Sequence, residues 1–317
     1  PDLQGNWTNA TMTPIDRPPG LGPVLSAEQV AMLVEGRQDF IQEAQEASDP
    51  DRGVPPVGGE QTGDATFDAA TGGTGGYNYF FIDAGDEVAY YDGEPRSSLI
   101  VEPADGRLPP FTEEGQRRLE AERAAASRFG EYDNPENRPL AERCIVSFGS
   151  NAGPPMTPNY FYNNNYTIVQ TPSHVMIMTE MVHDVRIIRL GDPDPLPDDV
   201  RPWFGDSWGT WEGETLVVET TNLHPDQRLF EISGAAFQPS ERVKVTERFT
   251  RVDESTINYE FTVEDPGMLT APVRGEIPFS RLDGLLYEYG CHEGNYALEN
   301  VLRGARAEEA RGPGDES

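Results

Sequence analysis

Three residues with acid–base or charged side chains lie close together in this sequence, His183, Asp184 and Arg186, at or beside a turn between two apolar runs. A histidine next to a carboxylate could transfer protons, and an arginine nearby could hold an anionic group. A hairpin turn with solvated charges would give the same pattern, so both interpretations stay open.

A second candidate pair, His292 and Glu293, directly follows Cys291 at the end of the last expected strand. If a disulfide at Cys291 fixed this end of a barrel, the two side chains could serve as a base and an acid. The Cys-His dipeptide has neither the haem-attachment spacing nor a set of zinc ligands. The alternative is a cap for the following helix, with Asn295 as the N-cap residue.

Two glutamates, Glu180 and Glu247, interrupt strand faces that are otherwise apolar. A buried carboxyl group holds its proton more tightly and could act as a general acid. The alternatives are faces that partly contact solvent, or a structural ion pair between each acid and an arginine such as Arg186.

Aromatic residues suggest a binding pocket. Trp208, Trp211 and Tyr162 could line a site for a flat or apolar ligand, with Glu247 as a polar group beside them. Ordinary core packing explains the same residues equally well.

The segment 191–199 is dense in acids, among them Asp192, Asp194 and Asp198. Calcium favours clusters of carboxylate oxygens, although the EF-hand spacing is absent. An acidic solvated loop is the alternative. The sequence has no phosphate-binding glycine loop or dinucleotide fingerprint, so we expect no cofactor, with calcium as the one candidate ion.

Composition limits the classes of partner. The 317 residues carry a formal net charge of −31, which disfavours nucleic acid and anionic membrane surfaces. No apolar stretch approaches the roughly 20 residues that a transmembrane helix needs. The 32 glycines and 28 prolines favour a β protein rich in turns.

The second half of the chain predicts a series of β-hairpins. Short β-rich runs alternate with turn residues, which is typical of a meander that closes into a barrel. We expect a mainly β fold, an antiparallel up-and-down meander forming a lipocalin-like barrel. The nine expected strands are 166–171, 175–182, 185–190, 207–211, 215–221, 242–251, 256–264, 273–281 and 285–290.

Helices are expected outside this region. Ser26 and Gln29 form a capping box that predicts a helix through about Ala47, and Thr112 caps a second helix over 113–129. A third helix is expected over 296–309. We therefore divide the chain into an α-containing segment (1–140) that wraps the barrel, the barrel (141–295), and a C-terminal helix and tail (296–317).

The two cysteines, Cys144 and Cys291, would pair in an exported protein and would be free thiols in a cytosolic one. The sequence starts at Pro1 without a methionine, which resembles a processed mature chain. We therefore expect the disulfide.

Five stretches resemble a widespread family of exported bacterial proteins with no assigned activity. They are residues 97–107, 163–172, 180–188, 205–218 and 287–296, within a resemblance that spans residues 77–306. The resemblance implies a signal peptide in the precursor and a periplasmic or extracellular mature protein. Separately, Gly5-Asn6-Trp7 resembles the Gly-x-Trp that opens lipocalin-like barrels.

The functional hypothesis is an exported protein that holds a small apolar or aromatic molecule in a pocket. It would bind this molecule or carry out cofactor-free acid–base chemistry of the lyase or isomerase type. The alternative hypothesis is a structural subunit of an extracellular homo-oligomeric or filamentous assembly without catalysis, in which calcium could bridge subunits.

Overall fold

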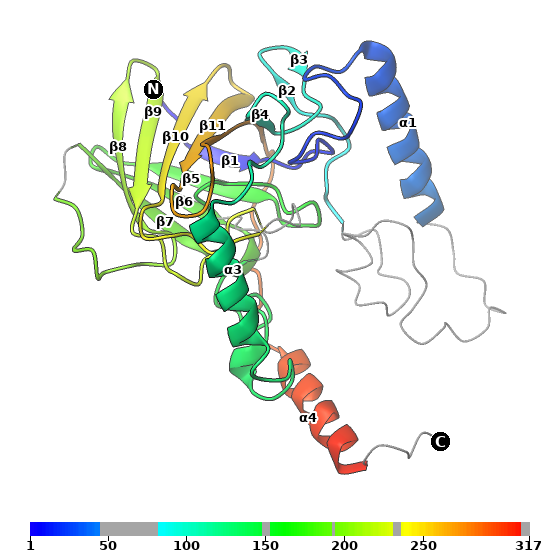
Figure 1. Cartoon of the computed structure of the whole chain (residues 1–317). Coiled ribbons are helices and arrows are strands. Elements are labelled where there is room, and N and C mark those ends of the chain that lie inside the picture. Colours follow the sequence, from blue (N-terminus) through cyan, green and yellow to red (C-terminus); the bar gives the residue numbers. More distant parts are fainter. Residues whose placement is uncertain (45–81, 148–152, 192–193, 231–235, 312–317) are drawn as a thin grey trace.

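A closed barrel of nine strands forms the centre of the protein (Figure 1). The computed structural model describes residues 1–44, 82–147, 153–191, 194–230 and 236–311. The barrel order is β1, then β5 to β12, and β12 pairs with β1 to close the ring. Its strands are β1 (Gly5–Thr8), β5 (Asn165–Gln170), β6 (His174–Thr179), β7 (Val185–Leu190), β8 (Asp206–Glu212), β9 (Thr215–Thr221), β10 (Lys244–Arg251), β11 (Thr256–Glu264) and β12 (Val273–Arg281).

The predicted mainly β fold and its closure into a barrel are confirmed, with one difference in strand direction. All neighbouring pairs in the ring are antiparallel except β7 and β8, which run parallel. Strands that alternate strictly in direction can close a ring only when their number is even. A ring of nine strands therefore needs a parallel pair, which the last three residues of β7 form with β8.

Eight of the nine expected strands are present, and the ninth prediction is wrong. Residues 285–290 form no strand, and Leu285 and Tyr287 are each 79% exposed. The closing strand is β1 instead, where Trp7 pairs with Tyr166 of β5 on one side and Arg281 of β12 on the other. The Gly-x-Trp sequence therefore does begin a barrel strand.

Alternate residues of the strands fill the inside of the barrel. On β10 and β11 the fully buried residues follow the two-residue period of a strand, as at Val245, Phe249 and Phe261. Residues 153–159 are also buried, and Met156 belongs to the same hydrophobic core. This segment therefore acts as an internal plug of the barrel.

The described helices lie outside the barrel (Figure 1). In α1 (Ala27–Ala44) the capping box is confirmed, because Ser26 and Gln29 exchange side-chain-to-backbone hydrogen bonds of 2.8 and 3.2 Å. Residues 45–47 of the expected helix lie outside the described residues. In α3 (Glu113–Ala126), Thr112 Oγ1 accepts from the Gly115 amide at 2.9 Å, as expected.

The remaining elements are short or peripheral. The expected C-terminal helix is α4 (Tyr296–Arg311), which continues beyond the end of α3 in Figure 1. Its Arg306 donates hydrogen bonds to the carbonyl groups of Tyr132 and Asp133, which follow α3 in the sequence. Strand β4 (Ile100–Glu102) pairs with β12 and extends the sheet. The first 140 residues therefore contribute two strands, β1 and β4, to this sheet. The others are β2 (Tyr90–Tyr91), β3 (Glu94–Pro95) and the 3₁₀ turns η2 (Pro135–Asn137) and η4 (Met181–His183).

Candidate active site at the disulfide end of the barrel

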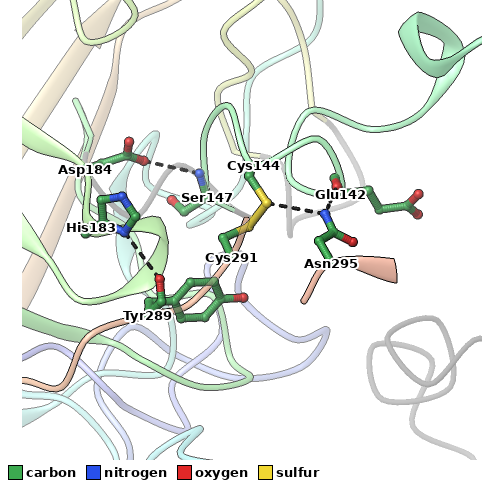
Figure 2. The surroundings of a disulfide bond; sticks show 8 residues. All are labelled: Glu142, Cys144, Ser147, His183, Asp184, Tyr289, Cys291 and Asn295. Carbon is green, nitrogen blue, oxygen red and sulfur yellow. Dashed lines mark hydrogen bonds between the residues drawn. A yellow bond between two sulfur atoms is a disulfide. The ribbon is translucent and has the colours of Figure 1, made fainter. Parts of the chain in front are cut away.

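The expected disulfide is present and organises one end of the barrel (Figure 2). Cys144 and Cys291 are bonded, with their Cα atoms 5.8 Å apart. The bond joins the segment that follows α3 to residues 285–295, which we call the strap. Asn295 of the strap strengthens this link, because its Nδ2 donates to the Glu142 carbonyl at 3.0 Å.

His183 sits on a strained turn between β6 and β7. Val182 and His183 have φ values of 59° and 47°, in the left-handed region. This region is unfavourable for a β-branched residue such as valine, and such strain often occurs at functional sites. The exposed His183 ring has its Nδ1 3.3 Å from the Tyr289 carbonyl of the strap, as Figure 2 shows.

Asp184 is the residue with the most unusual acidity in this cluster. Burial raises its pKa to about 7, while a hydrogen bond from the Ser147 amide and the proximity of His183 oppose the shift. The Ser147 nitrogen lies 3.3 Å from Asp184 Oδ2 (Figure 2). A carboxyl group that titrates near neutrality is suited to exchange protons with a substrate.

Glu180 occupies a different position from the one predicted. Strand β6 ends at Thr179, so Glu180 lies in the turn rather than on an apolar strand face. Its carboxylate is buried and accepts two hydrogen bonds, from Asn165 Nδ2 at 2.7 Å and from the Tyr287 amide at 3.0 Å. Glu180 therefore anchors the strap to the barrel end.

A pocket of about 340 Å³ lies beside the disulfide, and we call it the disulfide pocket. Tyr162, Tyr289 and Leu298 give it an aromatic and apolar wall, and Glu293 adds a carboxylate. Among the described residues that line it, none is basic. His292 is exposed and does not line the pocket, so the predicted pair His292–Glu293 contributes only its glutamate.

A second group of predicted residues meets inside the barrel. Arg186 Nη2 donates to Glu247 Oε2 at 2.6 Å, and the two side chains are 2% and 0% exposed. Tyr259 donates its hydroxyl to Glu247 Oε1 at 2.9 Å and accepts from the Met156 amide at 2.8 Å. Among the interpretations of Glu247, the structural ion pair with Arg186 is the one that the geometry shows.

The buried arginine is only partly satisfied. Within the described part of the chain, Arg186 Nε and Nη1 have no hydrogen-bond partner. The plug lies directly against this guanidinium, because a Cβ atom on Gly153 would be 3.0 Å from Arg186 Nη1. Arg186 thus points into the barrel, whereas His183 is at its rim.

The expected aromatic pocket is not assembled in one place. Trp208 pairs with Arg189 near the end of β7, and Trp211 lies farther along β8. Because β8 runs parallel to β7, both tryptophans are far from the turn where β7 starts. Trp211 packs against the core, while Tyr162 belongs to the disulfide pocket at the opposite end.

The acidic loop gives no support for a calcium site. Asp194 and Asp198 are exposed, and Asp192 lies outside the described residues. Within the described ranges, no group of three or more histidine, cysteine or acidic side chains is arranged to hold a metal ion.

Two important residues were not singled out from the sequence as members of a site. Tyr259 looks like an ordinary core aromatic, and only the fold brings its hydroxyl to Glu247. Tyr289 lies in the segment that was expected to be a strand, and its contact with His183 depends on that segment crossing the barrel end. The two residues of this contact lie in the stretches 180–188 and 287–296, which resemble the family of exported bacterial proteins. This resemblance is the one feature of the sequence that draws attention to both residues.

No described helix is long and apolar enough to cross a membrane. No protein-family model matches the chain, and a search of the curated proteins finds no relative.

Proposed function

We propose that this protein binds a small apolar or aromatic molecule in the disulfide pocket. The observation that carries the proposal is the position of this pocket. It has aromatic walls, and the strap residue Tyr289 links it to a strained turn bearing His183 and a carboxyl group, Asp184, with a pKa near neutrality. Strain and perturbed acidity near a pocket are features of functional sites.

The charges favour a neutral or cationic ligand. Glu293 is the uncommitted charged residue of the lining, because Glu142 is already held by two hydrogen bonds from Arg138. The net charge of −31 would also repel an anion from the surface. An aromatic or aliphatic amine would satisfy both the apolar wall and the carboxylate.

In the enzymatic form of this proposal the protein performs acid–base chemistry on the bound molecule. When His183 Nδ1 carries a proton and donates it to the Tyr289 carbonyl, Nε2 is left to accept one from the substrate. Asp184, whose pKa is raised by burial to about 7, would serve as the acid, and the Glu293 carboxylate would hold a cationic group of the substrate. The lyase or isomerase reactions that need one base and one acid fit this arrangement.

The proposed location is outside the cytoplasm, in the periplasm or the extracellular medium. The Cys144–Cys291 disulfide supports it, because such bonds persist in oxidising compartments. The resemblance to exported bacterial proteins adds to this argument. A lipocalin-like barrel would hold its ligand inside, but here large side chains and the plug occupy the interior, so we place the ligand at the disulfide end.

The test is ligand binding by two matched variants. Native mass spectrometry of protein from its own host would identify a bound molecule, or a library of aromatic and aliphatic amines would be screened by ligand-observed NMR. Leu298→Trp fills the disulfide pocket, whereas Leu285→Trp adds the same bulk at an exposed position of the strap. We expect the first variant to lose the ligand and the second to retain it; equal binding by both would refute the proposed site.

One observation favours the second hypothesis, a subunit of an extracellular assembly. Helix α4 has no buried residue, and its first residue Tyr296 and the strap residues Leu285 and Tyr287 are at least 70% exposed. A second copy of the chain could cover these side chains. Light scattering with and without calcium tests this, since a monomer under both conditions would remove the hypothesis.

A further inference from the structure

A second and larger pocket lies on the other side of the disulfide-linked segment. Its volume is about 690 Å³, within the range of roughly 300–1,000 Å³ that is typical of small-molecule sites. The second half of α3, residues 131–147 and residues 226–228 contribute to its lining. We call it the α3 pocket. Ala141 lines both pockets, so the segment held by the disulfide separates them.

Two of the three arginines in this pocket are already paired. Arg138 donates to Glu142 at 2.8 and 2.9 Å and to Glu131 at 2.6 Å. Arg228 forms an ion pair with Glu122. These pairs make a fixed, nearly neutral wall.

Arg143 differs from the other two arginines. Within the described ranges, its guanidinium takes part in no hydrogen bond or ion pair, although the side chain is half-buried in the pocket wall. A planar guanidinium with its donors free is the group that recognises a carboxylate through two parallel hydrogen bonds. Arg143 therefore offers a place for one acidic group of a ligand.

Gln227 provides a complementary acceptor. The side chain is 1% exposed, and its Oε1 is buried without a hydrogen-bond partner among the described residues. A buried carbonyl without a donor is unfavourable, so a ligand that brings an N–H group would gain from pairing with it. An amide is the simplest group that could do this.

The pocket also has uncommitted acids. Glu136 forms no ion pair within the described part of the chain, and Asp226 faces only His224, 4.0 Å away. Among the described residues, the free groups of the α3 pocket are thus one guanidinium, two carboxylates and one amide carbonyl. Such a mixture fits a ligand that carries both charges, rather than an anion or a cation alone.

We propose that the α3 pocket binds a short peptide with free ends. The peptide carboxylate pairs with Arg143, its ammonium group is held by Glu136 or Asp226, and a backbone N–H reaches Gln227. This inference concerns a site other than the disulfide pocket and does not depend on the function proposed for it.

Isothermal titration calorimetry with triglycine is the direct test, with the full chain in its oxidised form. Arg143→Gln removes the free guanidinium, and Arg117→Gln removes an exposed arginine of α3 that does not line the pocket. We expect Arg143→Gln to weaken binding about ten-fold or more, since a hydrogen-bonded charge is lost, and Arg117→Gln to bind as the parent does. Thermal unfolding confirms that both variants are folded.

Two modified peptides separate the charges. Triglycine with an amidated C-terminus should bind weakly to the parent protein and lose no further affinity in Arg143→Gln. N-acetylated triglycine should bind weakly to the parent but still respond to Arg143→Gln. Failure of the parent to bind triglycine at about 10 mM, or equal binding by Arg143→Gln, would overturn the inference.

Discussion

The buried ion pair inside the barrel allows a sharp prediction. Replacing Glu247 with glutamine keeps the shape of the side chain but removes the charge that Arg186 faces at 2.6 Å. Arg186 is 2% exposed, so water cannot readily replace the carboxylate as its partner. Its Nε and Nη1 have no hydrogen-bond partners within the described ranges, so no other group compensates for the lost charge. Removing one partner of a buried pair typically costs about 3–5 kcal/mol.

A matched control comes from the surface of the same barrel, where the pair again includes a residue of β10. Glu212 and Arg248 form an ion pair at 2.9 Å, with side chains 59% and 39% exposed. Glu212→Gln should lower the free energy of unfolding by no more than about 1 kcal/mol, because solvent screens this pair. The two substitutions make the same chemical change, so their difference measures the effect of burial.

Urea unfolding followed by tryptophan fluorescence gives both values. We expect Glu247→Gln to lose several times more stability than Glu212→Gln. A double variant, Arg186→Met with Glu247→Leu, should recover most of the loss, because it leaves no unpaired charge in the barrel. Equal losses in the two single variants, or a double variant no more stable than Glu247→Gln, would refute the reasoning.

Three further predictions concern other parts of the structure. Asp184 binds its proton more tightly in the folded state, with a pKa of about 7 against 3.8, so its contribution to stability is lost as the pH rises through 7. Asp184→Asn should therefore reduce the fall in Tm between about pH 5 and about pH 8; an unchanged fall would contradict it. Cys144→Ser opens a loop with a sequence separation of 147 residues and should lower the free energy of unfolding by about 5 kcal/mol; urea unfolding unaffected by the change would contradict this. Gly275→Ala places a Cβ atom 2.2 Å from Cζ of Phe261 and should cost about 1–3 kcal/mol, whereas Gly36→Ala on α1 meets open space and should not lower Tm. Equal Tm values for the two alanine variants would contradict the prediction, because they would show that Phe261 moves aside at little cost.

Most barrel strands could be predicted because they obey the two-residue period. On β10, Val245, Glu247 and Phe249 are buried in turn, as their alternation in the sequence indicates. The same two-residue period gave a wrong prediction for the strap. Leu285, Tyr287 and Tyr289 also alternate, but this segment crosses the barrel end and pairs with no strand, so its period has no structural meaning.

The candidate site could be predicted only in part. Glu293 and Tyr162 line one pocket, and the strap links His183 to it, because the disulfide holds the strap at the barrel end. The tryptophans of β8 are separated from it by a parallel pairing that no local pattern indicates. The acidity of Asp184 depends on burial beside Ser147, a contact between distant segments that residue types do not show.

The short strand β1 joins two strands that would otherwise be edges. Its four residues pair with β5 on one side, and Trp7 and Thr8 pair with the last two residues of β12 on the other. Without β1, β5 and the end of β12 that β4 does not cover would expose unpaired amides and carbonyls, which readily accept a strand from another molecule. A chain whose own β1 is displaced could take up the β1 of a second copy, so exchange of this strand offers a route to domain-swapped dimers. A synthetic peptide of the same residues could likewise complete a barrel from which they have been deleted.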